Sequence, residues 1–457
     1  MMNRTLSFVT ALALSGTLFA APRVSRSSID FRETPTAADI ENARTEYAGK
    51  NGNPDAVRVS LRSVDDASLA EVVKAFPGIT QIAIERSPAL TSIAPLASLR
   101  LKSVTLKGLE ALKSLAPLAG CTAVTQLNLN KLTAVEDADF QFCKGMAALS
   151  ELSVEAMPNT LKSFAGLEGC TGLRSLKVVR GAQAVDISAV KGLPELKRVE
   201  FRYVSGYDLT ALAALPKLEE LDLYGSRQID LAPLAGCAKL EKINVYATKA
   251  VKDYGALAQI KSLEDVHTGL TDMHDLSWAP QLPKLEKLVL FAETFDSFEP
   301  LSRCAKLESL RLWNMRNTTV DVAQFAQGAL TASLETLYLD SSTIVNESAI
   351  ANFRQLEKLN LSGVNDGKGK MRPLDLSFLA SLPELKEFNA EGKNAHTNLS
   401  AVEKCTELKS LYIAFPGADL SVVAKLPGLK TVRIRQSERA NLDKVLDGRK
   451  MTVYTVK

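Results

Sequence analysis

The chain has 457 residues, with 55 Lys and Arg against 52 Asp and Glu, and a formal net charge of +3. This near balance, without a basic run or a long disordered tract, gives no indication of a nucleic-acid backbone or an anionic membrane as an obligate partner. The length exceeds that of a usual single-core domain, yet no Gly/Ser linker divides the chain after residue 56, so we expect one elongated domain of repeats.

The N-terminus has the composition of a secretory signal. Arg4 precedes an apolar stretch from Leu6 to Leu14, and small residues follow at Ala20 and Ala21. This order is typical of a signal peptide that is removed on export. The stretch is shorter than the roughly 20 residues that a spanning helix needs, although a retained anchor is the alternative. We expect residues 1–20 to be cleaved and the mature chain to act in the periplasm, at the cell surface or outside the cell, without membrane insertion.

Residues 21–55 are expected to form an N-terminal segment that ends in a helix. Thr36 can cap a helix start, Asp39 adds an acid in the first turn, and Ala48-Gly49 has the composition of a helix end. We expect this helix to cover the open end of the repeat domain, which occupies residues 56–457.

From residue 56 onward one short unit repeats along the chain. Each unit has the form LxxLxL, as in Leu218-Glu-Glu-Leu221-Asp-Leu223, followed by a return segment. Twelve of the seventeen steps between units are 22 or 23 residues long, a period that indicates leucine-rich repeats. The first positions of the units are Ala56, Ile79, Leu101, Val124, Leu149, Leu173, Leu196, Leu218, Leu240, Leu263, Leu285, Leu307, Leu334, Leu356, Leu385, Leu408, Leu429 and Met451.

Strand geometry explains the letters of the unit. Positions four and six point to one face of an extended strand, while positions three, five and seven point to the other. The inward set is aliphatic, and return segments such as Ile229 to Lys239 carry leucines at helical spacing. One unit buries too little alone. We therefore predict an α/β solenoid, a horseshoe or arc of about 18 leucine-rich repeats with parallel strands on the concave face and short helices or 3₁₀ turns on the convex face.

Two long steps and the C-terminal end complete the fold prediction. The insertions at Asn314 to Gln327 and Val364 to Arg372 are expected to be loops on the rim. Leu442 to Leu446 is predicted to be the last helical turn and Met451 to Val456 the final strand, which shield the core at this end.

Five of the six cysteines share one phase, three residues before the next first position: Cys121, Cys170, Cys237, Cys304 and Cys405. Cys121 and Cys170 lie two repeats apart, near 10 Å at about 4.8 Å per strand and beyond the roughly 7 Å limit for a disulfide. Cys143 lies in the repeat between them, and a disulfide from it to either neighbour is the only one left open. We interpret all six as small buried apolar residues.

The repeats resemble two bacterial families. The units from Leu221 to Leu240 and from Leu99 to Cys121 resemble the 22-residue repeats of the internalin type. The recurring Cys-x-x-Leu, as in Cys170-Thr-Gly-Leu173, resembles bacterial surface repeats of the BspA type. The resemblance covers nearly the whole mature chain and implies an exported or surface-displayed recognition module. It describes the core and does not identify the ligand.

An aromatic column marks the outward positions of the central repeats. Position seven is aromatic in four of the five successive units that begin at Leu218, with Gly269 as the exception. Exposed rings offer a large contact area with few rotatable bonds, so we predict a partner-binding surface on the concave sheet. The candidate binding residues on and beside this column are Arg202, Tyr203, Tyr224, Tyr246, His267, Phe291, Arg311, Trp313 and Tyr338.

Other interpretations of the column remain open. Aromatic residues pair across neighbouring strands, so the rings could simply stabilise the sheet by about 0.2–1 kcal/mol per pair. They could also stack on sugar faces, which would make the domain a glycan-binding module. A purely structural envelope protein is a further candidate.

A second column is acidic, with glutamate at position two of seven consecutive units from Glu219 to Glu357. Stacked carboxylates could hold a hard cation such as calcium. However, lysines such as Lys217 and Lys284 flank the same leucines, and alternating charge columns are usually a solvated face. We therefore expect no metal site there.

The sequence offers little for catalysis. His267, His274 and His396 are the only histidines, and they do not fall at metal-binding helix spacing. No nucleophile elbow, phosphate loop, CxxC pair or kinase motif is present in the sequence. We expect a monomeric, non-catalytic recognition module without cofactor or metal. A protein on a host or bacterial surface is the favoured partner, a glycan is the alternative, and nucleic acid is not expected.

Overall fold

The computed structural model describes residues 21–136, 139–156, 163–180, 185–227, 229–249, 251–292, 294–315, 317–365, 370 and 372–456. The predicted signal peptide, residues 1–20, lies outside the described residues. So does most of the insertion at 364–372.

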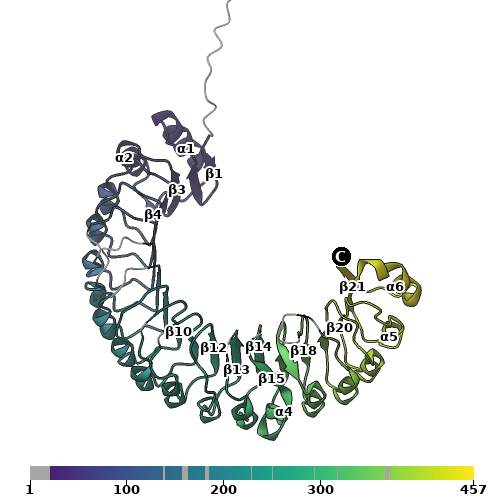
Figure 1. The fold of residues 1–457 in the computed structure, drawn as a ribbon. Helices are drawn as coiled ribbons and strands as arrows, with labels where there is room; N and C mark the ends of the chain where they lie inside the picture. Colours follow the sequence, from purple (N-terminus) through teal and green to yellow (C-terminus); the bar gives the residue numbers. More distant parts are fainter. Residues whose placement is uncertain are drawn as a thin grey trace, which may run out of the picture.

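The chain forms a long arc with a parallel sheet inside and short helices outside (Figure 1). Within the described residues the main sheet has twenty strands. From β2 onward its strands lie parallel in chain order, while β15 and β17 form a small sheet of their own. The strands are β1 Arg23–Val24, β2 Ser28–Phe31, β3 Val57–Arg62, β4 Ile79–Glu85, β5 Ser103–Lys107, β6 Gln126–Asn130, β7 Glu151–Glu155, β8 Ser175–Val179, β9 Arg198–Arg202, β10 Glu220–Asp222, β11 Lys242–Asn244, β12 Asp265–Gly269, β13 Lys287–Phe291, β14 Ser309–Trp313, β15 Thr319–Asp321, β16 Thr336–Tyr338, β17 Thr343–Val345, β18 Lys358–Asn360, β19 Glu387–Asn389, β20 Ser410–Tyr412, β21 Thr431–Arg435 and β22 Thr452–Val456.

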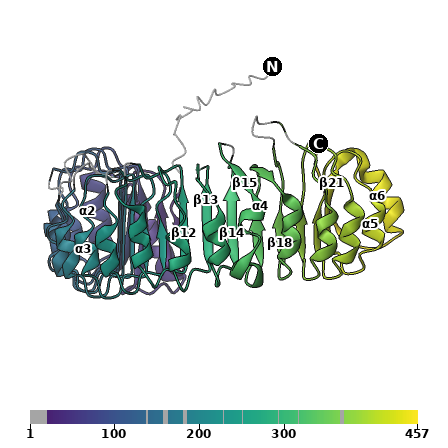
Figure 2. The same cartoon turned by 60° about the horizontal axis from the view of Figure 1, so that its bottom comes forward.

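The return segments form a layer of short helices on the convex side (Figure 2). The α-helices are α1 Ala37–Gly49, α2 Asp66–Ala75, α3 Thr210–Ala213, α4 Val322–Phe325, α5 Ser421–Ala424 and α6 Arg439–Leu446. The 3₁₀ helices are η1 Ala94–Ser98, η2 Ala116–Gly120, η3 Gln141–Cys143, η4 Leu167–Gly169, η5 Ser188–Gly192, η6 Ala232–Gly236, η7 Tyr254–Gln259, η8 Ala279–Gln281, η9 Glu299–Arg303, η10 Gly328–Ala332, η11 Glu347–Asn352, η12 Ser377–Ser381, η13 Leu399–Lys404 and η14 Gln436–Glu438. The predicted solenoid, with strands on the concave face and short helices on the convex face, is confirmed.

The N-terminal helix is present and begins where its capping residue predicts. The Thr36 hydroxyl accepts the Asp39 N–H at 3.2 Å, and the Asp39 carboxylate accepts the Thr36 N–H at 2.9 Å, which closes a capping box. The stack of strands begins earlier than the expected boundary at residue 56, because β2 pairs in parallel with β3. β1 then pairs antiparallel with the outer edge of β2.

Two predictions of local structure need correction. The insertion at 314–327 is not a plain loop, because β15 pairs with β17 and α4 follows it directly. The final helix and strand are present, but Val453 pairs with Val432, which makes Lys450 and not Met451 the first position of the last unit. Valines three residues apart, at 453 and 456, left the inward phase of that strand ambiguous in the sequence.

The core is one continuous column of aliphatic side chains between sheet and helices. Leu218, Leu221 and Leu223 of one unit are at most 2% exposed, and equivalent positions stack on them along the arc. All six cysteines are free and buried in this column. The Cys237 thiol donates to the Leu212 carbonyl of the preceding repeat at 3.6 Å, and burial raises its pKa to about 11. The interpretation of the cysteines as small buried residues is confirmed.

In several units a serine or threonine at the ninth position is buried and hydrogen-bonds to the backbone. Ser226 is fully buried, and its hydroxyl donates to the Phe201 carbonyl at 3.0 Å while it accepts the Tyr207 hydroxyl at 2.9 Å. Ser342 repeats the arrangement by donating to the Leu312 carbonyl at 2.7 Å. These hydrogen bonds satisfy backbone carbonyls near the ends of β9 and β14.

The eighth position has left-handed backbone geometry in every unit from Ser63 to Gly363. Its N–H continues the hydrogen-bond ladder, as in the 3.0 Å bond from the Ala292 N–H to the Trp313 carbonyl, while its positive φ turns the chain out of the sheet. Most of these residues are not glycine, although an L residue in this region costs about 1 kcal/mol or more. The stacked ladder therefore imposes the turn against local preference.

We expect Ala292→Gly to raise the free energy of unfolding by about 0.5–1 kcal/mol. Glycine removes the cost of the left-handed turn, and this gain exceeds the cost of the extra freedom that glycine has in the unfolded chain. Urea unfolding followed by circular dichroism measures the change. Ala97→Gly is the matched control, since Ala97 lies exposed in η1 without a positive φ, and it should destabilise by a similar amount. Equal destabilisation by both substitutions would contradict the prediction.

His396 should make stability depend on pH. The Leu374 N–H donates to its Nδ1 at 3.0 Å, its Nε2 lies 3.1 Å from the Ala390 carbonyl, and burial lowers the pKa of the imidazole. The unfolded state therefore binds a proton at His396 more readily than the folded state. The contribution of neutral His396 to the free energy of unfolding is complete above an unfolded pKa of about 6.5 and is lost as pH falls through the folded pKa. We expect the urea midpoint to fall between about pH 7 and pH 5, and to fall less steeply in His396→Gln. An identical slope in the variant would show that other groups cause the loss.

Candidate recognition surface

Strand register brings outward side chains from distant parts of the chain into two rows on the concave face. The third-position row runs through Arg198, Glu220, Lys242, Asp265 and Lys287. The fifth-position row runs through Glu200, Asp222, Asn244, His267, Val289, Arg311 and Tyr338.

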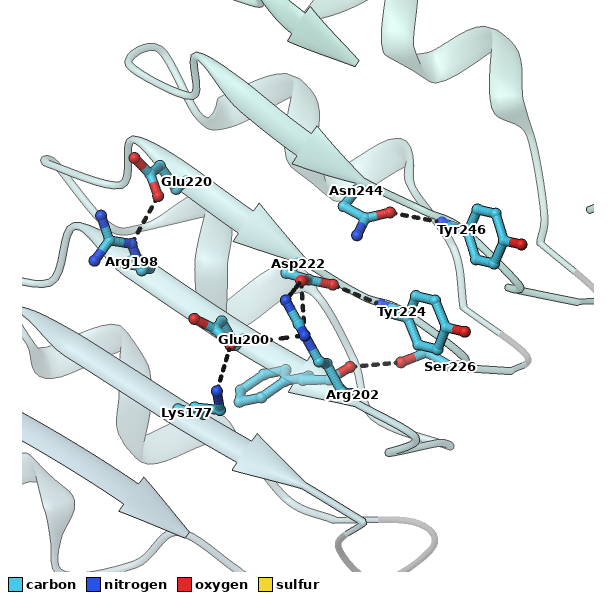
Figure 3. Close-up of polar contacts among 11 residues, drawn as sticks. Lys177, Arg198, Glu200, Arg202, Glu220, Asp222, Tyr224, Ser226, Asn244 and Tyr246 are labelled. Carbon is cyan, nitrogen blue, oxygen red and sulfur yellow. Dashed lines mark hydrogen bonds and ion pairs between the residues drawn. The ribbon is translucent and has the colours of Figure 1, made fainter. Parts of the chain in front are cut away.

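The fifth residue decides where two of the central strands end. The Asp222 side chain accepts the Tyr224 N–H at 2.9 Å, and Asn244 accepts the Tyr246 N–H at 2.9 Å (Figure 3). A side chain that takes the N–H two residues on forms an Asx turn and competes with the sheet ladder. β10 and β11 accordingly end at Asp222 and Asn244. Both tyrosines lie just beyond the strands, at the carboxyl edge of the sheet.

Five rings form an unbroken contact series along this edge, which we call the ring ladder: Tyr203, Tyr224, Tyr246, Phe291 and Trp313. Successive ring centroids lie 5.2, 5.1, 5.2 and 4.5 Å apart. Tyr224 and Tyr246 stack with their planes 7° apart, and the other pairs are edge-on or tilted. The rings lie side by side, as their phase predicts, but at the carboxyl edge rather than across the concave sheet. Their role in binding stays a prediction.

Two glycines make room for the ring ladder. A Cβ on Gly269 would lie 2.6 Å from the Phe291 Cβ and 2.9 Å from the Tyr246 Cδ2, so only glycine lets these two rings meet across the intervening strand. A Cβ on Gly225 would lie 2.6 Å from the Tyr203 Cδ1. The ring ladder therefore depends on both glycines, whose role the sequence analysis missed.

Arg311 joins the fifth-position row to one end of the ring ladder. Its guanidinium carbon lies 4.7 Å from the ring centroid of Trp313 and 5.6 Å from that of Tyr338, within cation–π range. The same group forms an ion pair with Asp340 at 3.2 Å. Burial raises the pKa of the Tyr338 hydroxyl, so the ring remains neutral at physiological pH.

Carboxylates on the rows contact Arg202 and His267, two further candidate binding residues. Arg202 donates from its Nε to Asp222 at 2.8 Å and has a second, shorter contact with the same carboxylate through Nη2. Glu200 lies 3.6 Å from Arg202 and 3.2 Å from Lys177, which joins this network in Figure 3. The His267 Nε2 lies 2.9 Å from the Asp265 carboxylate.

A shallow hollow of about 200 Å³ opens over the two rows beside the ring ladder. Arg198, Glu220 and Lys242 line one side, and the floor is the backbone and inward residues of β9 to β11. Arg198 contacts Glu220 at 2.6 Å and lowers the pKa of that carboxyl below its ordinary value. Lys242 shares the same carboxylate at 3.4 Å.

The predicted residues fall into one continuous region that also contains side chains missed from the sequence. The ring ladder, Arg202 and Arg311 with Tyr338, and His267 follow each other along β9 to β16. Asp222 and Asp340 were missed, although their positions in the repeat would have placed them beside the arginines. Leu270, which is 42% exposed next to the ring ladder, was also missed because an aliphatic residue at the eighth position gives no sequence signal of exposure.

The acidic column lies at the amino edge of the sheet, away from the ring ladder. Glu219 pairs with Lys197 at 2.7 Å, Glu264 with Lys284 at 3.7 Å, and Glu357 forms a shorter contact with Lys386. The described part of the chain contains no cluster of three or more His, Cys, Asp and Glu side chains that could hold a metal ion. It also contains no helix with both the length and the apolar character to cross a membrane.

Comparisons with known proteins support the fold. No family model and no curated protein sequence matches the chain. A leucine-rich-repeat protein of Leptospira interrogans superposes with a TM-score of 0.59 at 15% identity, over 92% of both chains. TLR13 in its complex with ssRNA13 superposes with a TM-score of 0.68 at 17% identity, over 94% of this chain and 64% of that chain. An internalin, InlF of Listeria monocytogenes, superposes only loosely, with a TM-score of 0.39 at 18% identity over 84% of this chain and 88% of that chain. The fold is that of a leucine-rich-repeat solenoid.

Gly269→Ala should break the ring ladder at its centre. The added methyl group would overlap Phe291 and Tyr246, and overpacking of this kind costs about 1–3 kcal/mol. We expect a lower urea midpoint and a weaker near-UV circular dichroism signal from the aromatic side chains. Gly192→Ala is the control, because its Cβ would meet no atom closer than 4.0 Å. A near-UV spectrum that Gly269→Ala leaves unchanged would rule out the proposed packing.

Proposed function

We propose that this protein is an exported, non-catalytic recognition module that binds a protein partner through the ring ladder and the adjacent concave rows. Residues 1–20 would act as the removable export signal, residues 21–55 as the N-terminal segment, and the repeats from residue 56 as the recognition domain. Periplasmic, surface-attached and extracellular locations are all compatible with this proposal.

The observation that carries the proposal is the exposure of apolar side chains along one edge. Tyr203 and Trp313 at the two ends of the ring ladder are 49% and 37% exposed, and Leu270 lies between them. Large apolar groups gathered on a surface and rimmed by polar residues are typical of contact sites. Trp, Tyr and Arg are also the residue types that most often dominate binding energy.

Ring geometry favours a protein partner over a glycan. Sugar binding needs an open aromatic face. Tyr224 and Tyr246 face each other at 5.1 Å, and Arg311 lies over the Trp313 ring, so several faces are already occupied. The ring edges that remain suit apolar side chains of a protein. The same ring contacts stabilise the sheet edge. The alternative that the rings serve only to stabilise the sheet is therefore tested together with binding.

Tyr246→Ala and Trp313→Ala should each weaken capture of the partner at least about tenfold, the effect of losing roughly 1.4 kcal/mol of binding free energy. The assay is a pull-down from host-cell and bacterial surface proteins, quantified by mass spectrometry, with a glycan array in parallel. Tyr454→Ala is the matched control, since Tyr454 is 50% exposed but lies on β22 at the far end of the arc (Figure 1).

Circular dichroism must show that the variants remain folded. Capture that both ladder variants leave undiminished would reject the site. Ladder-dependent signals on the glycan array alone would replace the protein partner with a glycan.

A further inference from the structure

We propose that the ring ladder and the two rows beside it bind an extended, acidic peptide segment whose side chains alternate between carboxylate and apolar groups. This inference rests on the proposed function and adds the chemistry of the partner. It rests on which partner of each ion pair on the concave face lies nearer the solvent.

In the ion pairs of the concave face, the cation is the outer group. The Arg202 side chain is 42% exposed and its partner Asp222 only 14%, while Arg311 is 38% exposed and Asp340 11%. The same order holds for Arg198 over Glu220, and the His267 ring likewise lies outside Asp265 as an N–H donor. An approaching ligand therefore meets N–H donors first, with the carboxylates beneath them. Complementary charge on the partner is negative.

The outer cations have bonding capacity beyond the acids that hold them. A guanidinium carries five N–H donors in a planar fork, of which Asp222 takes those on Nε and Nη2 of Arg202. A second carboxylate on the ligand can share the same guanidinium from the solvent side. Lys242 lies 3.4 Å from a carboxylate that already has Arg198 at 2.6 Å, so it too can turn towards a ligand.

The balance of charge excludes a densely charged ligand. Arg198, Arg202 and Lys242 line the hollow, and Lys177 adjoins it through its ion pair with Glu200, so four cations face the four acids of the lining. These acids are Glu200, Glu220, Asp222 and Asp265. Nucleic acid, with one charge per about 1.7 Å of duplex, needs a surplus of positive charge to release its counterions. A peptide with a few separated carboxylates needs only the shared donors.

The arrangement of the two strips sets the length and pattern of the segment. The rows and the ring ladder run in parallel across β9 to β14, and five strand spacings of about 4.8 Å give about 24 Å. An extended peptide of about seven residues has that length. Its side chains alternate between two sides, so one set can lie over the cationic rows and the other over the rings.

The test is selection of a displayed random-peptide library on the full-length mature protein, with sequencing before and after. We expect wild type to enrich Asp and Glu roughly threefold over the input, alternating with apolar residues, an excess within the range of single charge contacts. Lys242→Gln combined with Lys287→Gln should remove most of the acid enrichment and keep the apolar enrichment. Both lysines are exposed on the third-position row, and Glu220 keeps Arg198 as its partner, so the fold should survive.

The matched control combines Lys239→Gln with Lys252→Gln, which removes the same charge from exposed lysines that lie off the two rows and should leave the selection unchanged. Enrichment of basic or uncharged peptides that still depends on Tyr246 and Trp313 would overturn the acidic partner and leave the recognition site standing. No enrichment, or enrichment that Tyr246→Ala and Trp313→Ala do not affect, would overturn both. Tighter binding of a single-stranded oligonucleotide or a sulfated polysaccharide at about 0.15 M salt would overturn the argument for a sparse anion.

Discussion

Register between stacked repeats is the constraint on which the rest of the structure depends. A strand of three to five residues with one short helix cannot form a core alone, but Leu221 packs between Val199 and Ile243 of the neighbouring units and each shields the others. A slip of one residue would turn every inward side chain outward. The aliphatic core thereby fixes the outward rows as well. Each outward side chain has a defined neighbour on the next strand, so one surface can extend over more than a hundred residues of the chain.

This constraint explains which features of the fold the sequence could reveal. A given position has the same environment in every unit, so phase was enough to identify the core leucines, the buried cysteines and the order of the rings. It was not enough for the left-handed turn at position eight, because the residues there, such as Lys131 and Ala292, have no common chemistry. The turn is imposed by the ladder of neighbouring strands. β15 was missed because it and its partner β17 lie outside the LxxLxL segments, where the repeat phase gives no indication of a strand.

The sequence predicted where the candidate surface lies, but not how its side chains pack and hydrogen-bond. Counting from the first leucine placed the rings in one column, yet it did not reveal that Asp222 and Asn244 form Asx turns and end their strands two residues before the tyrosines. That effect depends on a side-chain hydrogen bond, which hydrophobic periodicity does not encode. The layering of Arg311 over Asp340 is also a property of packed side chains, because the sequence gives both residues but not which of them is outermost.

The repeat that begins at Leu263 departs from the pattern at its sixth position, and it lies at the centre of the ring ladder. Thr268 occupies an inward position that is normally aliphatic, is fully buried, and its hydroxyl has no hydrogen-bond partner within the described residues. Burying such a group costs about 1–3 kcal/mol. Gly269 and Leu270 follow, one lacking a side chain where rings must meet and the other an exposed aliphatic residue with positive φ. A buried hydroxyl without a partner, a glycine that admits two neighbouring rings and an exposed leucine thus follow each other beside one apolar surface, a pattern expected where a functional site competes with the fold. The packing of the core accounts for neither the glycine nor the exposed leucine, whereas a ligand lying along the ring ladder would contact the surface that both of them form.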